Sequence, residues 1–137
     1  MKLYKRENYL QKIRGFYDAD DIIKVITGVR RCGKSSLMKI ISEELKDKGV
    51  DDDHIIFIDF DRRGYKSIKT TEQLESVIEE KTRVKGMKYL FLDEIQNVRG
   101  FEEVINGYRT EGNYSIFISG SNSYLLSGEC YSSLYLN

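Results

Sequence analysis

The sequence predicts an α/β fold, with helices packed on a parallel sheet, in one domain of 137 residues. Short runs of β-branched and aromatic residues alternate with longer segments whose apolar residues recur at helical spacing. The first run leads directly into a glycine-rich stretch, and the third run ends in two acidic residues. This alternation is typical of strands joined by right-handed helical crossovers.

The N-terminal segment is predicted to be an amphipathic helix within residues 1–19. Its apolar residues fall on one helical face. They are Leu3, Leu10, Ile13, Phe16 and Tyr17. The basic residues of this segment are expected to form a solvated face; a phosphate-facing patch is the alternative.

Four runs are predicted to be strands, namely residues 22–27, 54–59, 89–94 and 115–119. A helix is expected from Lys34 to the stop signal at Gly49. A second helix should begin at a capping box formed by Thr70 and Gln73. A third begins near Phe101, and its turn at residues 112–113 leads into the last strand. Residues 123–136 are also predicted to be helical.

Composition excludes several classes of function. The 22 basic and 22 acidic residues cancel, so net charge gives no argument for nucleic-acid binding. The two cysteines, Cys32 and Cys130, are far apart and indicate neither a metal site nor a disulfide framework. No signal peptide and no apolar run of about 20 residues is visible, so we predict a cytoplasmic protein without a membrane span.

The stretch GVRRCGKSS has the pattern G-x-x-x-x-G-K-S between a predicted strand and a predicted helix. Its backbone N–H groups and the helix N-terminus suit the phosphates of a nucleotide. Lys34 would reach the β- and γ-phosphates, and the Ser35 hydroxyl would ligate Mg²⁺. The alternative is a glycine-rich turn without a ligand. The predicted binding residues are Gly28, Val29, Arg30, Arg31, Cys32, Gly33, Lys34, Ser35 and Ser36.

Two strand ends supply the other candidate residues. Asp93 would hold Mg²⁺, and Glu94 would orient and deprotonate an attacking water. After the fourth strand, Asn122 is the preferred polar residue near the γ-phosphate, with Ser121 as the alternate. The predicted catalytic residues are thus Lys34, Glu94 and Asn122. Acids and serines that merely close strands before turns are the alternative explanation.

These segments together resemble AAA-type P-loop ATPases. GVRRCGKSS resembles a Walker A motif, YLFLDE a Walker B motif and FISGSNS a sensor-1 strand. More narrowly, LFLDEIQNVRGFEEVI and ISGSNSYLLSGE resemble a group of bacterial and archaeal AAA-like ATPases. The resemblance implies the three-layer P-loop fold with strand order 5-1-4-3-2. It also implies ATP and Mg²⁺ as cofactors, ATP/ADP as ligands, and hydrolysis as the activity.

The chain departs from this family after the sensor helix, where the expected small residue and Gly-Arg are absent. We therefore expect residues 1–137 to be a C-terminally truncated nucleotide-binding domain that lacks strand five and any arginine finger. Two expectations follow. Hydrolysis should be weak, because a finger can contribute about 10³–10⁵ in rate. The chain should self-associate through the exposed edge of strand one or through its C-terminal helix.

Two other functions stay open. A non-hydrolysing nucleotide switch or regulatory scaffold would use Lys34, Ser35 and Asp93 but not Glu94. A small-molecule kinase would need an acceptor pocket and lid arginines, and the Asp-Glu pair argues against it. Two further groups of acidic residues could suggest metal sites. We expect residues 51–54 to form a solvated turn and not a cation site. We expect Asp59 and Asp61 to mark a polar strand end and not the metal pair of a nuclease.

Overall fold

The computed structural model describes residues 10–26, 34–120 and 133–136. Five strands form one sheet in the order β2-β3-β4-β1-β5, and every neighbouring pair is parallel. The strands are β1 (Ile23–Ile26), β2 (Ile55–Asp59), β3 (Lys88–Asp93), β4 (Tyr114–Ser119) and β5 (Ser133–Leu136). Read from the other side, this is the predicted order 5-1-4-3-2, and the α/β fold class is confirmed.

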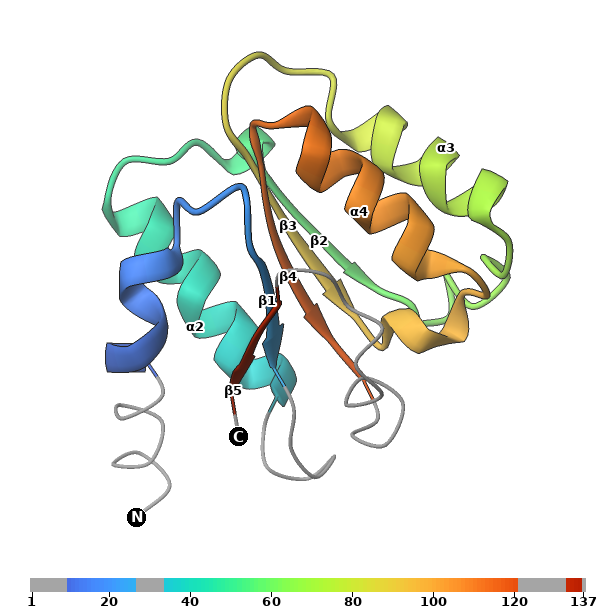
Figure 1. The fold of residues 1–137 in the computed structure, drawn as a ribbon, viewed down its shortest axis with the longest axis horizontal. Helices are drawn as coiled ribbons and strands as arrows, with labels where there is room; N and C mark the ends of the chain where they lie inside the picture. The colour runs from blue at the N-terminus through green and yellow to red at the C-terminus, as the bar shows by residue number, and fades with distance from the viewer. Residues whose placement is uncertain (1–9, 27–33, 121–132, 137) are drawn as a thin grey trace.

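Helices cover both faces of the sheet (Figure 1). On one face lie α2 (Lys34–Asp47) and a helical turn at residues 10–13 that continues into the 3-10 helix η1 (Arg14–Phe16). On the other face lie α3 (Thr71–Lys81) and α4 (Phe101–Glu111). Two further 3-10 turns, η3 (Asp52–His54) and η4 (Ile95–Asn97), precede β2 and follow β3. Residues 1–9 of the predicted N-terminal helix lie outside the described residues.

Each face of the sheet carries its own hydrophobic core. Under α3 and α4, the core contains Leu74, Ile78, Val104 and Ile105 against side chains of β1 to β4. On the α2 face, aromatic rings of neighbouring strands stack. The Phe91 ring lies 5.7 Å from Phe57 and 4.6 Å from Phe117, measured between ring centroids. Aromatic pairs in this geometry contribute about 0.5–1.5 kcal/mol beyond area burial, so this stack ties β2, β3 and β4 together.

The helix ends follow the local signals of the sequence. The Thr70 side chain accepts the backbone N–H of Gln73 at 3.2 Å, and the Gln73 side chain accepts the Thr70 N–H at 3.1 Å. The predicted capping box is therefore confirmed. Gly49 follows α2 with φ +102° and Gly112 caps α4 with φ +89°, a conformation that disfavours residues with a Cβ.

The fifth strand corrects two expectations. We expected residues 123–136 to be helical and strand five to be missing, but residues 133–136 form β5 and pair with β1 from Ile23↔Ser133 to Ile26↔Leu136. Leu-Tyr-Leu is a short apolar run that fits a strand as well as a helix, and pairing satisfies the backbone of β1. Neither the open edge of strand one nor a helix over these four residues is therefore present for self-association. Residues 121–132 lie outside the described part of the chain.

A segment that begins with η1 crosses the starting end of the sheet and is held there by buried polar groups. We call this segment, residues 14–21, the N-terminal strap. Lys24 of β1 is fully buried, and its Nζ donates to the Ala19 carbonyl and to Ser115 Oγ. Ser115 Oγ donates in turn to the Tyr17 carbonyl. The strap thus fastens to β1 and β4 through groups whose hydrogen bonds are made within the fold.

Side chains of the strap make further bonds to the layers beside it. Arg14 forms a bidentate pair with Glu44 of α2 at 3.0 and 2.7 Å, and Tyr17 Oη donates to the same carboxylate at 2.8 Å. Tyr89 Oη donates to Asp18. Burial raises the pKa of Tyr17 and of Tyr89 well above the ordinary range, and their carboxylate partners act in the same direction. Both phenols therefore stay protonated donors near neutral pH.

Among the described residues, no helix combines the length and the apolar composition that crossing a membrane requires.

Candidate functional site

The parallel register brings three strand ends together. Ile26 of β1 is the register partner of Ser119 in β4, and Leu92 of β3 pairs with Ile118. The end of β1, the acids after Leu92 and the end of β4 therefore lie together at the carboxyl edge of the sheet, and the start of α2 lies at the same end (Figure 1). Ligands of open parallel α/β sheets bind at this edge. We call it the carboxyl edge below.

Asp93 is the buried acid of this edge. Its side chain is 1% exposed, and its Oδ1 accepts a hydrogen bond from Ser119 Oγ. The Glu94 N–H donates to the same hydroxyl oxygen at 3.4 Å. Ser119 thus joins the ends of β3 and β4. Burying a carboxyl group without a hydrogen-bond partner is costly, so this bond stabilises the buried position of Asp93.

The donor set of the carboxyl edge fits Mg²⁺, because carboxylate and hydroxyl oxygens are the ligands this ion prefers. Asp93 supplies a carboxylate whose orientation is fixed by Ser119. Across the next strand pair, Asp59 is the register partner of Asp93 and brings a second carboxylate to the same end of the sheet. Asp59 Oδ1 accepts the backbone N–H of Asp61 at 2.9 Å, which closes a local turn and agrees with its interpretation as a polar strand end.

Glu94 follows Asp93 in a left-handed backbone conformation, with φ 57° and ψ 44°. For a residue with a Cβ this conformation costs of order 1–3 kcal/mol and persists where the surrounding fold imposes it. Its half-buried side chain accepts a hydrogen bond from Gln96 Nε2 at 2.7 Å. The turn therefore directs the Glu94 side chain out of the strand ladder and beside η4.

The predicted phosphate loop is described only at its end. Lys34, Ser35 and Ser36 form the first turn of α2, and their side chains are not described. Residues 28–33 (Gly28, Val29, Arg30, Arg31, Cys32 and Gly33) lie outside the described residues, as do Ser121 and Asn122. The structure thus brings Asp93, Glu94 and the backbone of Lys34 to one edge, and the roles of all these residues stay predictions.

Two residues of the site, and one at the opposite end of the sheet, have contacts that the sequence did not predict. Ser119 belongs to a predicted strand, and its place at the end of a buried run is a signal for a side chain at the edge. Gln96 gave no signal, because its importance depends on the turn at Glu94. Lys24, at the other end of the sheet, was hidden in a run of apolar strand residues.

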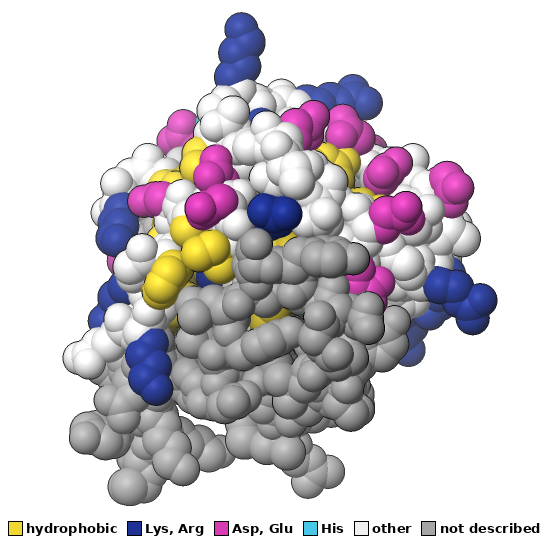
Figure 2. All heavy atoms as spheres, in the orientation of Figure 1, with side chains coloured by type: hydrophobic (Ala, Val, Ile, Leu, Met, Phe, Trp, Pro, Cys, Tyr) yellow, Lys and Arg dark blue, Asp and Glu magenta, His cyan; other side chains and the backbone are white. Residues whose placement is uncertain are grey.

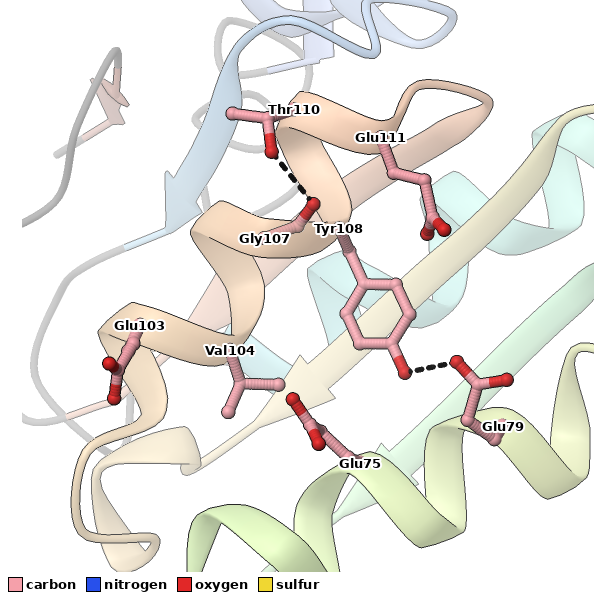
Figure 3. Close-up of a pocket in the computed structure, with 8 residues that line it drawn as sticks. All are labelled: Glu75, Glu79, Glu103, Val104, Gly107, Tyr108, Thr110 and Glu111. Carbon is pink, nitrogen blue, oxygen red and sulfur yellow. Dashed lines mark hydrogen bonds between the residues drawn. The ribbon is translucent and has the colours of Figure 1, made fainter.

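A groove elsewhere in the molecule does not suit a polyphosphate. It lies between α3 and α4, has a volume of about 550 Å³, and is lined by Glu75, Glu79, Glu103 and Glu111 around Tyr108 (Figure 3). Tyr108 Oη donates to Glu79 at 2.7 Å. Acidic side chains also lie over these helices on the face shown in Figure 2. Four glutamates would repel phosphate groups, so this groove is not the nucleotide site.

The cluster of Asp51, Asp53 and His54 has carboxylate and imidazole atoms within 4.8 Å of one another. Both ring nitrogens of His54 face acceptors, with Nε2 2.8 Å from the Lys85 carbonyl and Nδ1 2.9 Å from Asp53. The Lys85 carbonyl, and then Asp53, raise the pKa of His54. A protonated imidazole satisfies both contacts, which agrees with a solvated turn and not with a cation site.

Comparison with known proteins decides the family. The model of the AAA domain family matches residues 20–135, which include β1 to β4, most of β5 and the carboxyl edge. The chain belongs to the AAA domain family. This AAA domain is of the P-loop ATPase type, as the Walker-like segments had indicated.

Two relatives have names that assign no function. An "Uncharacterized protein" of Haemophilus influenzae is 40% identical over 128 residues, covering 93% of this chain and 32% of the relative. "Uncharacterized protein MJ1544" of Methanocaldococcus jannaschii is 37% identical over 113 residues, covering 82% of this chain and 24% of the relative. The chain thus spans about a third and a quarter of the lengths of these relatives.

Two solved structures share the fold of this AAA domain. A DNA polymerase III gamma subunit-related protein of Thermotoga maritima matches with a TM-score of 0.63 at 12% identity, over 94% of this chain and 45% of its own. The ORC2 protein of Aeropyrum pernix, solved in ADPNP–ADP complexes, matches with a TM-score of 0.54 at 13% identity, over 98% and 46%. At these identities the likeness concerns the fold. Family and fold together support an ATPase-like, nucleotide-binding function.

Proposed function

We propose that this AAA domain binds ATP with Mg²⁺ at the carboxyl edge and hydrolyses it. One observation supports the proposal above all. The strand β1, which leads into the Gly-rich stretch, and β3, which ends at Asp93, lie on either side of β4. Ser119 of β4 is the register partner of Ile26 in β1 and donates a hydrogen bond to Asp93. The ORC2 protein of the same fold was solved with ADPNP and ADP, which agrees with nucleotide binding here.

The residues of this edge would divide the work. The backbone of residues 28–33 and the N-terminus of α2 would hold the phosphates, and Lys34 would neutralise the β- and γ-phosphates. Ser35 and Asp93 would hold Mg²⁺, which offsets negative charge on the transferring phosphoryl group. Glu94 would accept a proton from the attacking water, and Asn122 would contact the γ-phosphate. A partner residue would supply an arginine, because Arg30 and Arg31 belong to a loop that works through its backbone.

The test compares phosphate release by wild type and Glu94→Gln in single-turnover conditions, with protein in excess over Mg·ATP and sampling over hours. We expect the variant to bind ATP as well as wild type. It should release phosphate at about a hundredth of the wild-type rate or below, since a positioned base is lost. Equal rates in the two proteins would remove Glu94 from the chemistry. Tight ATP binding with no phosphate release from either protein would favour the non-hydrolysing switch instead.

A further inference from the structure

Gln96 is tied to the proposed base by a short contact that the proposed function does not use. Its Nε2 donates to Glu94 Oε1 at 2.7 Å, two residues back in the chain. Its own Oε1 is buried and has no hydrogen-bond partner among the described residues. The amide orientation is decided by the chemistry of the contact, because only the NH₂ group can face a carboxylate oxygen favourably.

The turn that carries Gln96 is fixed from both sides. The neighbouring Asn97 donates its Nδ2 to the Phe60 carbonyl at 3.2 Å, which anchors η4 to the end of β2. The Asn97 N–H also donates to the Glu94 carbonyl at 3.2 Å. Ile95 and Val98 on either side are fully buried. Gln96 is therefore presented by a rigid element, so its hydrogen bond restricts where the Glu94 carboxylate can lie.

A purely stabilising glutamine would be expected to use both ends of its amide, because a buried acceptor without a donor costs free energy. Here one end is unsatisfied and the other holds a carboxylate on a left-handed residue. Both features are unfavourable for the fold by themselves. Unfavourable local arrangements that the fold nevertheless maintains are concentrated at functional sites.

We propose that Gln96 is a positioning residue that fixes the direction of the Glu94 carboxylate. This inference rests on the proposed function, because it takes Glu94 to be the group that accepts a proton from water. An amide N–H donated to one carboxylate oxygen limits the rotation of the whole carboxylate. Gln96 would thus keep the base aimed without touching the nucleotide.

The first experiment detects the hydrogen bond itself and needs no turnover. The side-chain amides of glutamine are labelled with ¹⁵N, and the Gln96 NH₂ signals are assigned by NMR with Gln96→Met. These signals should shift in Glu94→Ala, which removes the acceptor of the hydrogen bond. The NH₂ signals of Gln73, in the capping box of α3, should stay unchanged and serve as the control.

The second experiment measures single-turnover phosphate release and ATP affinity. Gln96→Met should release phosphate at about a tenth of the wild-type rate or below, while its ATP affinity stays within about twofold of wild type. Gln96→Glu, which replaces the amide donor with a carboxyl group, should be slowed at least as much. A positioning role also predicts that Glu94→Gln combined with Gln96→Met is no slower than Glu94→Gln alone.

The outcomes separate this inference from the function it rests on. Gln96 side-chain signals that do not shift in Glu94→Ala overturn the positioning role, whatever the rates. If Glu94→Gln hydrolyses normally, the proposed base is wrong, and the NMR result then only describes a hydrogen bond without a catalytic consequence, which also overturns the inference. Should Gln96→Met fail to fold, Gln96→Glu, which retains the shape of the side chain, decides in its place.

Discussion

Buried polar side chains lie at both ends of the parallel sheet, and their hydrogen bonding differs between the ends. At the starting end, Lys24 Nζ donates to Ser115 Oγ and to the Ala19 carbonyl of the N-terminal strap, and Ser115 Oγ donates to the Tyr17 carbonyl. At the carboxyl edge, Glu94 has a left-handed backbone, and Gln96 Oε1 is the buried side-chain oxygen that lacks a partner among the described residues. The polar groups at the starting end have their hydrogen bonds made, whereas the carboxyl edge holds a strained backbone and an unsatisfied oxygen.

The difference separates polar groups that hold the fold from polar groups that are available for chemistry. A network with every donor used can be buried at little cost and fastens one segment to another. A strained or partly satisfied group lowers stability and is retained where it serves a ligand. Changes at the starting end should therefore alter stability without altering nucleotide binding. Changes at the carboxyl edge should alter nucleotide binding or hydrolysis and should not lower stability.

The largest expected effect concerns Lys24. Desolvation by burial lowers the pKa of Lys24 from 10.5 to about 7, although Asp20, Asp21 and Asp18 act in the opposite direction. Between these values the unfolded chain binds a proton that the folded chain does not, so the free energy of unfolding should rise with pH. The slope is at most about 1.4 kcal/mol per pH unit, or about 4 kcal/mol from pH 7 to 10.

Urea unfolding across this pH range measures the slope in wild type and in Lys24→Met. We expect the variant, which cannot titrate at this position, to lose the rise. The window closes near pH 10, because the buried tyrosines then begin to ionise in the unfolded chain and stability falls again. A wild-type profile as flat as that of Lys24→Met would show that Lys24 is not a buried titrating group.

A smaller effect is expected for Tyr89→Phe at the same end. The change removes the hydroxyl that donates to Asp18 and leaves the ring in the core beneath α2. Hydrogen bonds to charged groups contribute about 1.5–3 kcal/mol, so the unfolding midpoint in urea should fall correspondingly. Its ATP affinity should equal that of wild type. Weaker ATP binding with unchanged stability would contradict the division between the two ends.

The smallest effect has the opposite sign. Glu94→Gly should raise the free energy of unfolding by about 0.5–1 kcal/mol, because glycine adopts the left-handed conformation without strain. The same change should abolish hydrolysis. Asn113→Gly is the matched control, since Asn113 also has a positive φ of 69° but lies in an exposed turn. It should gain less stability, because asparagine tolerates this conformation, and should keep activity. A lower free energy of unfolding in Glu94→Gly would show that the backbone of Glu94 is not strained.

The strands and helices could be predicted because their signals are local, whereas the order of the strands was implied by the resemblance to AAA-type ATPases. The runs before Gly28 and before Asp93 have the length and β-branched composition of buried strands, and the capping box at Thr70 sets the start of α3. Asp93 and Glu94 could be placed at the carboxyl edge for the same reason: a parallel topology puts the end of every strand on one side.

Other features depend on contacts between distant segments and could not be read from periodicity. Residues 133–136 become a strand because β1 offers an open edge, which their own sequence does not reveal. The hydrogen bond from Ser119 to Asp93 joins neighbouring strands. Gln96 can donate to Glu94 only because the backbone of Glu94 is left-handed. The burial of Lys24 depends on the strap that covers it. Tertiary pairing decided each of these cases over local pattern.

Calorimetric titration of Mg·ATP into wild type, Lys34→Ala and Tyr89→Phe tests most directly whether the carboxyl edge holds a nucleotide. We predict one binding site in wild type, the same affinity in Tyr89→Phe, and the loss of most of that affinity in Lys34→Ala, because we take Lys34 to be the cation that would reach the phosphates. Equal affinities in wild type and Lys34→Ala would contradict this prediction, and so would an affinity lost through Tyr89→Phe in a protein that remains folded.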